Sequence, residues 1–345
     1  MQVIDIHTHL ITVLNVCKHY LGINFLQSLI NKHSLPFVLA LDNLIPFTKK
    51  DTLSRYADMI RSENKTAKQL LNKLIAESQG VDEFCILTIN MQNMGGGKVP
   101  QSFEDQLKDV IKLKLDGYPI RIFYHADPND HQCISLLKKY EKFIDGIKLY
   151  CLMGYFPYDK RLDDVYALCV KNNWSVISHC APENPTHYRG RDIDKRLKES
   201  RFGLIEGKNN RQKAANFAHP IHLKETARLN TNINFCAAHC GGYDEIMKFL
   251  DDKQSWTRLI LDSCNMLDNF YTDISCTIAS QKAYDFFRKV LFMTNISNKI
   301  LYGSDYWLNL GTNVHSAYVN DLKKEIGLQD FVKIASQNTS NFMKL

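Results

Sequence analysis

Short apolar runs recur along the 345-residue chain, and longer stretches of mixed polarity separate them. The runs are rich in β-branched and aromatic residues, which favour strands. Several of them are almost continuously apolar, as is typical of parallel strands that are covered on both faces. The pattern predicts strands at residues 2–8, 84–91, 120–126, 146–151, 174–180, 233–240, 270–278 and 299–307.

The stretches between these runs carry apolar residues at helical spacing. "DDVYALCVKNN" is one example, and "AHPIHLKETARLN" indicates a helix that begins near Pro220. A repeated alternation of strand and helix predicts an α/β protein, a (β/α)₈ or TIM barrel. We expect helices at residues 130–143, 160–172, 220–230, 243–252 and 280–295.

Two segments are longer than the usual connections of such a barrel. Residues 10–80 contain helix-like pieces broken by Pro36 and Pro46, which predicts a helical insertion after the first strand. Residues 181–220 predict a long basic loop after the fifth strand. No repeat or low-complexity linker divides the sequence, so we expect residues 1–345 to form a single barrel domain with these two insertions.

The composition indicates a protein that does not enter a membrane. No apolar run approaches the roughly 20 residues that a membrane-spanning helix needs. The first apolar stretch is short and interrupted by Asp5, His7 and His9, unlike a signal peptide. The ten cysteines form no Cys-x-x-Cys pair, so we expect reduced, mostly buried thiols. These features together predict a cytoplasmic protein.

The net charge of +6 is concentrated in one segment. Residues 181–220 hold five acids and the basic residues Arg189, Arg191, Lys195, Arg196, Lys198, Arg201, Lys208, Arg211 and Lys213. This segment is either a solvated surface helix or an electropositive rim that attracts an anionic substrate. Nucleic acid is a less favoured partner. Under the second interpretation, Arg189 and Arg191 are candidate substrate-binding residues.

Chemically active side chains fall near the carboxyl ends of the predicted strands, where the active sites of such barrels form. The set consists of His7, His9, Lys148, His179, His239 and Asp305. His7 and His9 are two residues apart on the first strand and therefore project to the same side. Each of the others lies in its own strand, embedded in apolar sequence.

Imidazole nitrogens and a carboxylate are ligands for Zn²⁺ and its first-row neighbours. A bound divalent metal ion, which we expect to be zinc, would lower the pKa of its water from about 15.7 to about 7. Asp305 can ligate the metal and also accept the proton of that water, then pass it to the leaving group.

Lys148 has three possible roles in this arrangement. An ammonium group cannot ligate a metal and would be repelled by it. Lys148 therefore either points away to form an ion pair or stays protonated to hold an anionic substrate. Alternatively, it captures CO₂ to become a carbamate that bridges two metal ions. Charge balance does not decide among these roles.

The segments "DIHTHL", "GIKLY", "ISHC", "AAHCGG" and "ILYGSDYW" occur in an order that resembles the amidohydrolase superfamily. The resemblance is to the amidohydrolase-related branch that includes aminocarboxymuconate-semialdehyde decarboxylase. The closing "SQNTSNFMKL" is similar to the C-terminal helix of this family, with its Asn. The chain departs from the branch at "SDYW", which replaces Ser-Asp-Tyr-Pro, and in its longer, more basic 181–220 segment.

The resemblance implies that His7, His9 and Asp305 bind a metal ion. It implies that His179 ligates the same metal or a second one. His239 would ligate the second metal in a two-metal site, and would be a catalytic acid/base or substrate-orienting group in a one-metal site.

The same resemblance gives Lys148 a place among the ligands. "GIKLY" looks like the stretch that carries the carbamylated lysine in dihydroorotase-like members. Many one-metal relatives have an unmodified lysine in this strand, so one or two metal ions per chain remain possible.

Several further residues are weaker candidates. Tyr155 is a candidate substrate-binding residue, although packing of the loop is an alternative role. His125 ends the third predicted strand and is either structural or within reach of a substrate. Asp5 is expected to orient one of the paired histidines through a hydrogen bond. His219 and His222 have a spacing that can bind metal, but we interpret them as residues of a helix start.

Three functional hypotheses follow from these residues. The first is a metal-dependent hydrolase that uses metal-activated water on an amide, lactone or ester bond of a small anionic substrate. The second is a metal-dependent decarboxylase of the same fold. The third is a non-catalytic barrel that binds or regulates a partner through its basic loop. We also expect a homo-oligomer.

Overall fold

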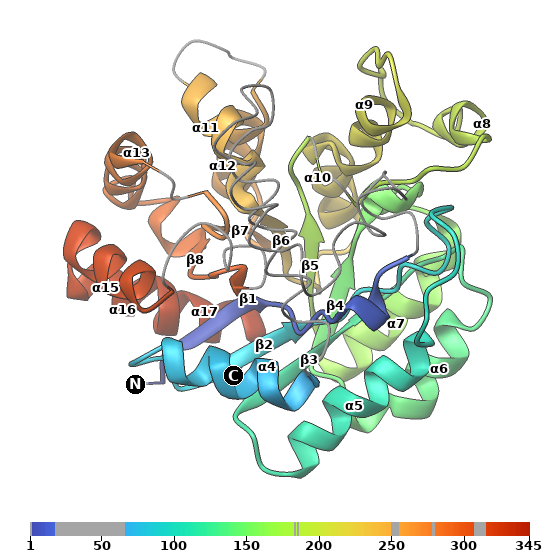
Figure 1. The fold of residues 1–345 in the computed structure, drawn as a ribbon. Coiled ribbons are helices and arrows are strands. Elements are labelled where there is room, and N and C mark those ends of the chain that lie inside the picture. The colour runs from blue at the N-terminus through green and yellow to red at the C-terminus, as the bar shows by residue number, and fades with distance from the viewer. Residues whose placement is uncertain are drawn as a thin grey trace, which may run out of the picture.

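The computed structural model describes residues 2–17, 66–182, 184, 186–249, 255–277, 280–306 and 315–345. It confirms the predicted barrel, in which eight parallel strands follow one another in sequence order (Figure 1). Every predicted strand is present, and each is shorter than the apolar run that predicted it. The strands are β1 Ile4–Thr8, β2 Glu83–Leu87, β3 Ile120–His125, β4 Gly146–Leu149, β5 Ser175–His179, β6 Phe235–Ala238, β7 Phe270–Asp273 and β8 Ile300–Leu301.

Helices surround this barrel in the described part of the chain (Figure 1). The five helices predicted from periodicity correspond to α6, α7, α10, α11 and α13. The helices are α4 Ala67–Glu77, α5 Phe103–Leu115, α6 Cys133–Tyr140, α7 Asp163–Asn172, α8 Ile193–Leu197, α9 Asn210–Ala215, α10 Pro220–Leu229, α11 Tyr243–Lys248, α12 Trp256–Met266, α13 Gln281–Leu291, α15 His315–Ile326, α16 Leu328–Val332 and α17 Asn338–Met343.

Two backbone hydrogen bonds join the first strand to the segment that follows the last strand, which nearly closes the barrel. The Ile6 N–H donates to the Tyr302 carbonyl at 3.2 Å, and the Asp305 N–H donates to the His7 carbonyl at 2.8 Å. The second hydrogen bond joins two candidate site residues directly. The contact between the first and last strands therefore also brings His7, near the start of the sequence, next to Asp305, near its end.

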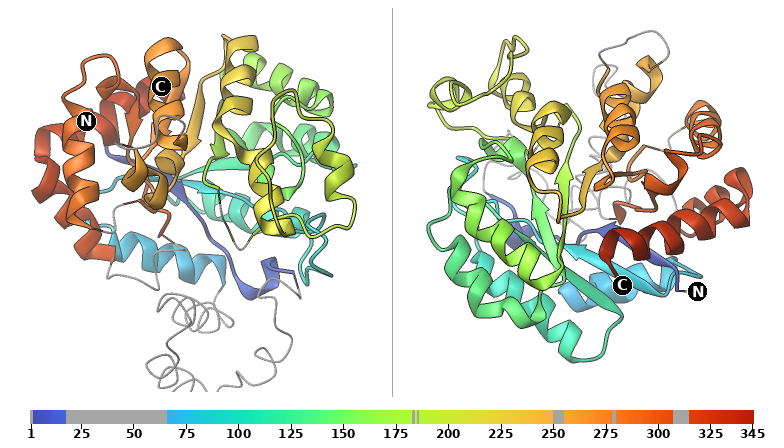
Figure 2. Two further views of the ribbon diagram at one scale, coloured as in Figure 1. Left: turned by 90° about the horizontal axis from the view of Figure 1, so that it is seen from above. Right: turned by 180° about the vertical axis from the view of Figure 1, so that it is seen from behind.

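The C-terminal helix packs against the barrel at the end where the strands begin. Asn338 donates from Nδ2 to the carbonyls of Ser297 and Ile300 at 2.8 and 2.7 Å, which fixes α17 to the start of β8. The Ser175 hydroxyl donates to the Phe342 carbonyl, which fixes the other end of the helix to β5. The N- and C-termini lie near one another (Figure 2). The Asn of the family-like closing segment thus has a structural role.

The two predicted insertions differ in how far the structure describes them. After β1, a short 3₁₀ turn at Val13–Asn15 and α4 are described, whereas residues 18–65 lie outside the described residues. The 181–220 segment contains the short helices α8 and α9 instead of forming a continuous loop. An ion pair of 2.7 Å between Lys213 Nζ and Asp194 Oδ1 joins these two helices. Within the described ranges, no helix has both the length and the apolarity that crossing a bilayer requires.

Candidate active site

One small buried cavity at the carboxyl ends of the strands is lined by all six predicted metal-site residues. Its volume is about 20 Å³, enough for one water-sized particle. Each of the six residues is at most 5% exposed. They are His7, His9, Lys148, His179, His239 and Asp305. Six more described residues complete the lining: Ile11, Ile89, Met91, Tyr150, Asn184 and Thr186.

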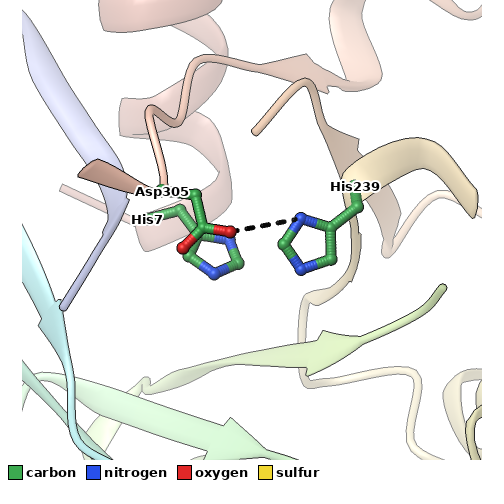
Figure 3. A group of neighbouring side chains, drawn as sticks. All are labelled: His7, His239 and Asp305. Atoms are coloured by element: carbon green, nitrogen blue, oxygen red, sulfur yellow. Dashed lines mark ion pairs between the residues drawn. The ribbon is translucent and has the colours of Figure 1, made fainter. Parts of the chain in front are cut away.

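His7, His239 and Asp305 form the centre of this group (Figure 3). Their potential ligand atoms lie within 4.8 Å of one another. His239 Nδ1 is 4.0 Å from Asp305 Oδ2. The three residues come from β1 and from the turns that follow β6 and β8, so residues far apart in the sequence are brought together by the barrel.

Hydrogen bonds fix the tautomers of the paired histidines. His9 Nδ1 lies 2.7 Å from the Leu87 carbonyl, and His7 Nδ1 lies 2.9 Å from Asp273 Oδ2. A carbonyl and a carboxylate only accept, so each Nδ1 carries the hydrogen and each Nε2 keeps a lone pair. His9 Nε2 is 3.6 Å from Asp305 Oδ1. Both imidazoles thus present the nitrogen that a metal ion can bind.

The same reasoning applies to His239 and His179. His239 Nδ1 is 3.1 Å from the Ser275 carbonyl and therefore donates to it. His239 Nε2 then accepts from His179 Nδ1, at 3.0 Å. This leaves the lone pair on His179 Nε2, a buried atom with no hydrogen-bond partner among the described residues. The ring of His179 is held by stacking on Tyr150, with ring centroids 4.7 Å apart.

Burial keeps all four imidazoles neutral near pH 7. It lowers the pKa of His7 to about 4 and that of His239 to about 4. It also lowers the pKa values of His9 and His179 well below the ordinary value. Neutral imidazole is the form that ligates metal ions. The four histidines are therefore in the neutral form that can bind a metal ion, and their positions also suit one.

Lys148 points toward the same cavity. Its Nζ lies 3.4 Å from His7 Nε2 and 5.8 Å from the centre of the Tyr150 ring. Burial lowers the pKa of the ammonium group to about 8. This placement is inconsistent with a lysine that points away from the site. The two other roles, a substrate-binding cation and a carbamate, are both compatible with it.

The backbone is strained at two of the site residues. His239 and Asp305 have φ angles of 68° and 51°, in the left-handed region. Such conformations cost about 1–3 kcal/mol each and persist where the surroundings impose them. Here the Asp305 N–H is held by the His7 carbonyl, and the His239 N–H by Asp273 Oδ1. Strain of this kind is concentrated at functional sites.

Asp5 has a different role from the one expected. Its Oδ1 accepts the backbone N–H groups of His7 and Ser304, at 3.1 and 3.0 Å, and so ties β1 to the segment after β8. The residue that orients an imidazole is Asp273, which the sequence analysis did not single out. The sequence does contain a feature that could have identified Asp273. It is an acidic residue in the apolar run "FYTDIS", at the carboxyl end of a strand, as the other site residues are.

The three predicted substrate-binding residues are not among those that line the cavity. The Tyr155 hydroxyl accepts from the Tyr150 N–H at 2.8 Å and donates to the Ala126 carbonyl at 2.9 Å. It is therefore engaged by the main chain. Arg191 is exposed, and Arg189 is partly buried on the same loop.

The remaining histidine candidates have structural contacts. His125 Nδ1 accepts from the Asn90 N–H at 2.8 Å, outside the cavity lining. His219 caps α10, because its Nδ1 accepts from the Ile221 N–H at 3.3 Å. His222 is buried in an aromatic cluster. The interpretation of His219 as a helix-start residue is confirmed.

The chain is similar in fold to several solved structures over its whole length. One is a probable 2-pyrone-4,6-dicarboxylic acid hydrolase from Acinetobacter baumannii with bound citric acid, at 10% identity, 100% coverage of both chains and a TM-score of 0.59. Another is 5-carboxyvanillate decarboxylase from Novosphingobium aromaticivorans with manganese, at 12% identity, 100% and 96% coverage and a TM-score of 0.54. A third is an amidohydrolase from Burkholderia multivorans with bound zinc, at 10% identity, 100% coverage of both and a TM-score of 0.54.

At such low identity these likenesses establish a shared fold and not a shared reaction. No curated protein matches the sequence. The family described as amidohydrolase matches residues 92–340, which is well over half of the chain and extends from β3 to β8 and the C-terminal helices. The chain therefore belongs to the amidohydrolase family of enzymes.

Proposed function

We propose that the protein is a metal-dependent hydrolase that cleaves an amide, lactone or ester bond of a small substrate. The observation that carries the proposal is the convergence of ligand-type side chains on one buried cavity. His7, His9 and His179 each keep a lone pair on Nε2 in the tautomer that their Nδ1 hydrogen bonds set, and the Nε2 of His7 lies 3.4 Å from Lys148 Nζ. The carboxylate of Asp305 lies beside His9 and His239.

These donors fit a divalent cation. His179 Nε2 is a buried nitrogen that no described residue satisfies, and a metal ion would satisfy it. Three imidazoles and one carboxylate suit Zn²⁺ and its first-row neighbours. We propose His7, His9, His179 and Asp305 as the ligands of one such ion. When bound, a metal ion there would polarise the scissile carbonyl and lower the pKa of a nucleophilic water.

His239 is the group left for proton transfer or substrate orientation. Its Nδ1 hydrogen is donated to Ser275, and its Nε2 is engaged by His179, so it lacks a lone pair free for a metal ion in this tautomer. A second ion would require His239 to exchange these hydrogen bonds for ligation and Lys148 to become a carbamate. The hydrogen bonding therefore favours the one-metal arrangement.

The residues of the chain account for the movement of protons. Asp305 accepts a proton from the attacking water as the water oxygen bonds to the carbonyl carbon. The bond from that carbon to the leaving nitrogen or oxygen then breaks, and the leaving atom takes the proton from Asp305. His239 Nδ1 lies 4.0 Å from Asp305 Oδ2, and its ring would hydrogen-bond the reacting group by exchanging its hydrogen bond to Ser275 or to His179. Lys148, as an ammonium, would hold an anionic group of the substrate.

The cavity is small, about 20 Å³, and we propose that most of the substrate lies toward the surrounding loops. We propose an anionic substrate, because the positive charge of the chain is concentrated in residues 181–220 after β5. We also propose a cytoplasmic protein, since the cysteines are thiols and not disulfides, as expected in a reducing compartment.

Metal content tests the proposal. The protein is purified without chelators, and metal per chain is measured by elemental mass spectrometry for the natural sequence and for Asp305→Asn. About one metal per chain, lost in the variant, supports the one-metal hydrolase, and about two supports a binuclear site with carbamylated Lys148. No metal above background, even after addition of Zn²⁺ or Mn²⁺, overturns the proposal and leaves a non-catalytic barrel.

A second assay separates hydrolysis from decarboxylation. The metal-loaded protein is incubated with panels of simple amides, lactones, esters and aromatic carboxylic acids. Release of an acid from the first three classes, absent in Asp305→Asn, supports the hydrolase. Release of CO₂ from the carboxylic acids with no hydrolysis overturns it in favour of the decarboxylase.

A further inference from the structure

Asp273 contacts two histidines of the candidate site through different oxygens. Its carboxylate is fully buried at the carboxyl end of β7. Oδ2 accepts from His7 Nδ1 at 2.9 Å. Oδ1 accepts from three donors, namely the backbone N–H of His239 at 2.9 Å, the backbone N–H of Ser275 at 3.0 Å, and the Ser275 hydroxyl. The Asp273 carboxylate therefore contacts His7 on β1, His239 after β6 and Ser275 after β7.

The contact with His7 determines which nitrogen faces the cavity. A carboxylate oxygen cannot donate a hydrogen bond, so it stabilises the tautomer of His7 with hydrogen on Nδ1. Nε2, the other ring nitrogen, keeps its lone pair. A carboxylate behind a ligating histidine fixes both the tautomer and the ring orientation of that histidine.

Ser275 extends this control to His239. The Ser275 hydroxyl donates to Asp273 Oδ1, and its oxygen lies 3.1 Å from His7 Nδ1 and 2.9 Å from His239 Nδ1. Asp273 also holds the His239 backbone, which adopts a left-handed conformation. Asp273 and Ser275 thus connect His7, a proposed metal ligand, with His239, the proposed proton-transfer residue.

We propose that Asp273 is the positioning residue of this site, which together with Ser275 keeps His7 in the metal-binding tautomer and sets the place of His239. The proposal rests on the metal site proposed above and assigns it a residue outside the ligand set. Neither Asp273 nor Ser275 lines the cavity, so both act through the histidines.

Asp273→Asn is a sharp test because the structure dictates how the new amide is oriented. Three donors converge on Oδ1, so the amide oxygen must take that position. The NH₂ group then faces His7 Nδ1, where two hydrogens cannot meet. His7 must move its hydrogen to Nε2 or turn its ring, and either change removes the lone pair from the metal.

Two readouts follow, neither of which depends on catalysis. Metal affinity, measured by competition with a chromophoric chelator, is expected to fall about 10- to 100-fold. In metal-free protein with ¹⁵N-labelled histidine, the His7 signals are expected to change from the Nδ1–H to the Nε2–H pattern. Their assignment comes from the spectrum of His7→Gln.

Asp127→Asn is the matched control. Asp127 is also a buried aspartate in a loop that follows a strand, and it accepts from the Asn129 N–H at 2.9 Å and from the Asn93 amide at 3.4 Å. It does not line the cavity. This variant is expected to keep the metal affinity and the His7 spectrum of the natural sequence.

A double variant tests whether Ser275 acts together with Asp273. If the two residues are one unit, adding Ser275→Ala to Asp273→Asn weakens metal binding no further than Asp273→Asn alone. Fully additive losses would overturn the joint role.

The outcomes separate this proposal from the proposed function. If the natural protein binds metal and Asp273→Asn binds it equally well with an unchanged His7 tautomer, the positioning role is wrong. If the natural protein binds no metal, the hydrolase proposal fails, and the His7 spectrum of metal-free Asp273→Asn still decides whether Asp273 sets the tautomer. Unfolding curves of each variant verify that the chain remains folded.

Discussion

His9 Nε2 lies 3.6 Å from Asp305 Oδ1, which places the first strand of the barrel against the segment that follows the last strand. The same seam is held by the hydrogen bond from the Asp305 N–H to the His7 carbonyl. Asp5 adds one more hydrogen bond across the seam, from the Ser304 N–H, and also accepts from the His7 N–H within β1. Three of the four proposed metal ligands, His7, His9 and Asp305, thus lie at this seam, so most of the site depends on the contacts between β1 and the segment after β8.

Replacing Asp5 tests this link between seam and site. Asp5→Asn keeps an oxygen at Oδ1 and is expected to retain both hydrogen bonds. Asp5→Leu removes the acceptor and leaves two buried N–H groups unpaired, at about 1–3 kcal/mol for each. We expect a drop of about 2–6 kcal/mol in the free energy of unfolding for the leucine variant, measured with guanidinium chloride, and a much smaller drop for the asparagine variant. Equal stability of the two would contradict the role of Asp5.

Tyr155→Phe distinguishes a structural residue from a substrate-binding one. The variant removes a hydroxyl that accepts from the Tyr150 N–H and donates to the Ala126 carbonyl. Since these partners are buried, the free energy of unfolding should fall by about 1–3 kcal/mol. Substrate affinity should change only indirectly, through Tyr150, which stacks on His179. A rise in KM with no loss of stability would restore Tyr155 as a substrate ligand.

The sequence predicted the barrel because strand formation follows from local patterns of apolar residues. It also predicted six of the side chains that line the cavity, since the carboxyl ends of parallel strands meet at one mouth of the barrel. Asp273 was missed for a physical reason. Its importance lies in contacts with His7 and His239, and such contacts depend on the register between strands, which no single strand's residues reveal.

Tyr155 and Asp5 illustrate the same limit. An aromatic residue soon after a site strand is equally compatible with a pocket wall and with a packed loop, and only the positions of Tyr150 and Ala126 decide. Asp5 lies on the same face as His7 and was expected to contact an imidazole. Its carboxylate instead accepts from the backbone N–H groups of His7 and Ser304.

Asp127 should make the stability of the protein depend on pH. Burial raises the pKa of its carboxyl from 3.8 to about 6. The folded state therefore holds this proton more tightly than the unfolded state, and the free energy of unfolding decreases as the pH rises from about 4 to about 6. The loss is at most about 3 kcal/mol and is complete above pH 6.

Asp127→Asn lacks this titration, so its stability relative to the natural sequence should increase over the same pH interval and then stay constant. Urea unfolding of both proteins at several pH values between 4 and 8 measures the difference. A constant difference across the interval would show that the carboxyl titrates equally in the folded and unfolded states.

The basic segment should affect the capture of an anionic substrate more than its conversion. Arg191, Lys195 and Lys198 are exposed, whereas Lys213 is paired with Asp194. Replacing the three exposed residues by glutamine should raise KM, weaken the dependence of kcat/KM on ionic strength and leave kcat unchanged. A salt dependence identical to that of the natural protein would indicate that this segment is only a solvated surface.

Metal binding should stabilise the folded protein and not the variant that lacks a ligand. A ligand at 100 times its Kd adds about 2.7 kcal/mol to the free energy of unfolding. For a chain of this length we expect Tm to rise by several degrees when Zn²⁺ is added to metal-free protein. Asp305→Asn should show a much smaller rise, because its amide is neutral and a poorer ligand. Asp127→Asn should respond like the natural sequence, since its substitution lies outside the cavity. An equal rise in all three proteins would place the stabilising metal ion elsewhere on the chain, and calorimetric melting curves with and without a chelator provide the measurement.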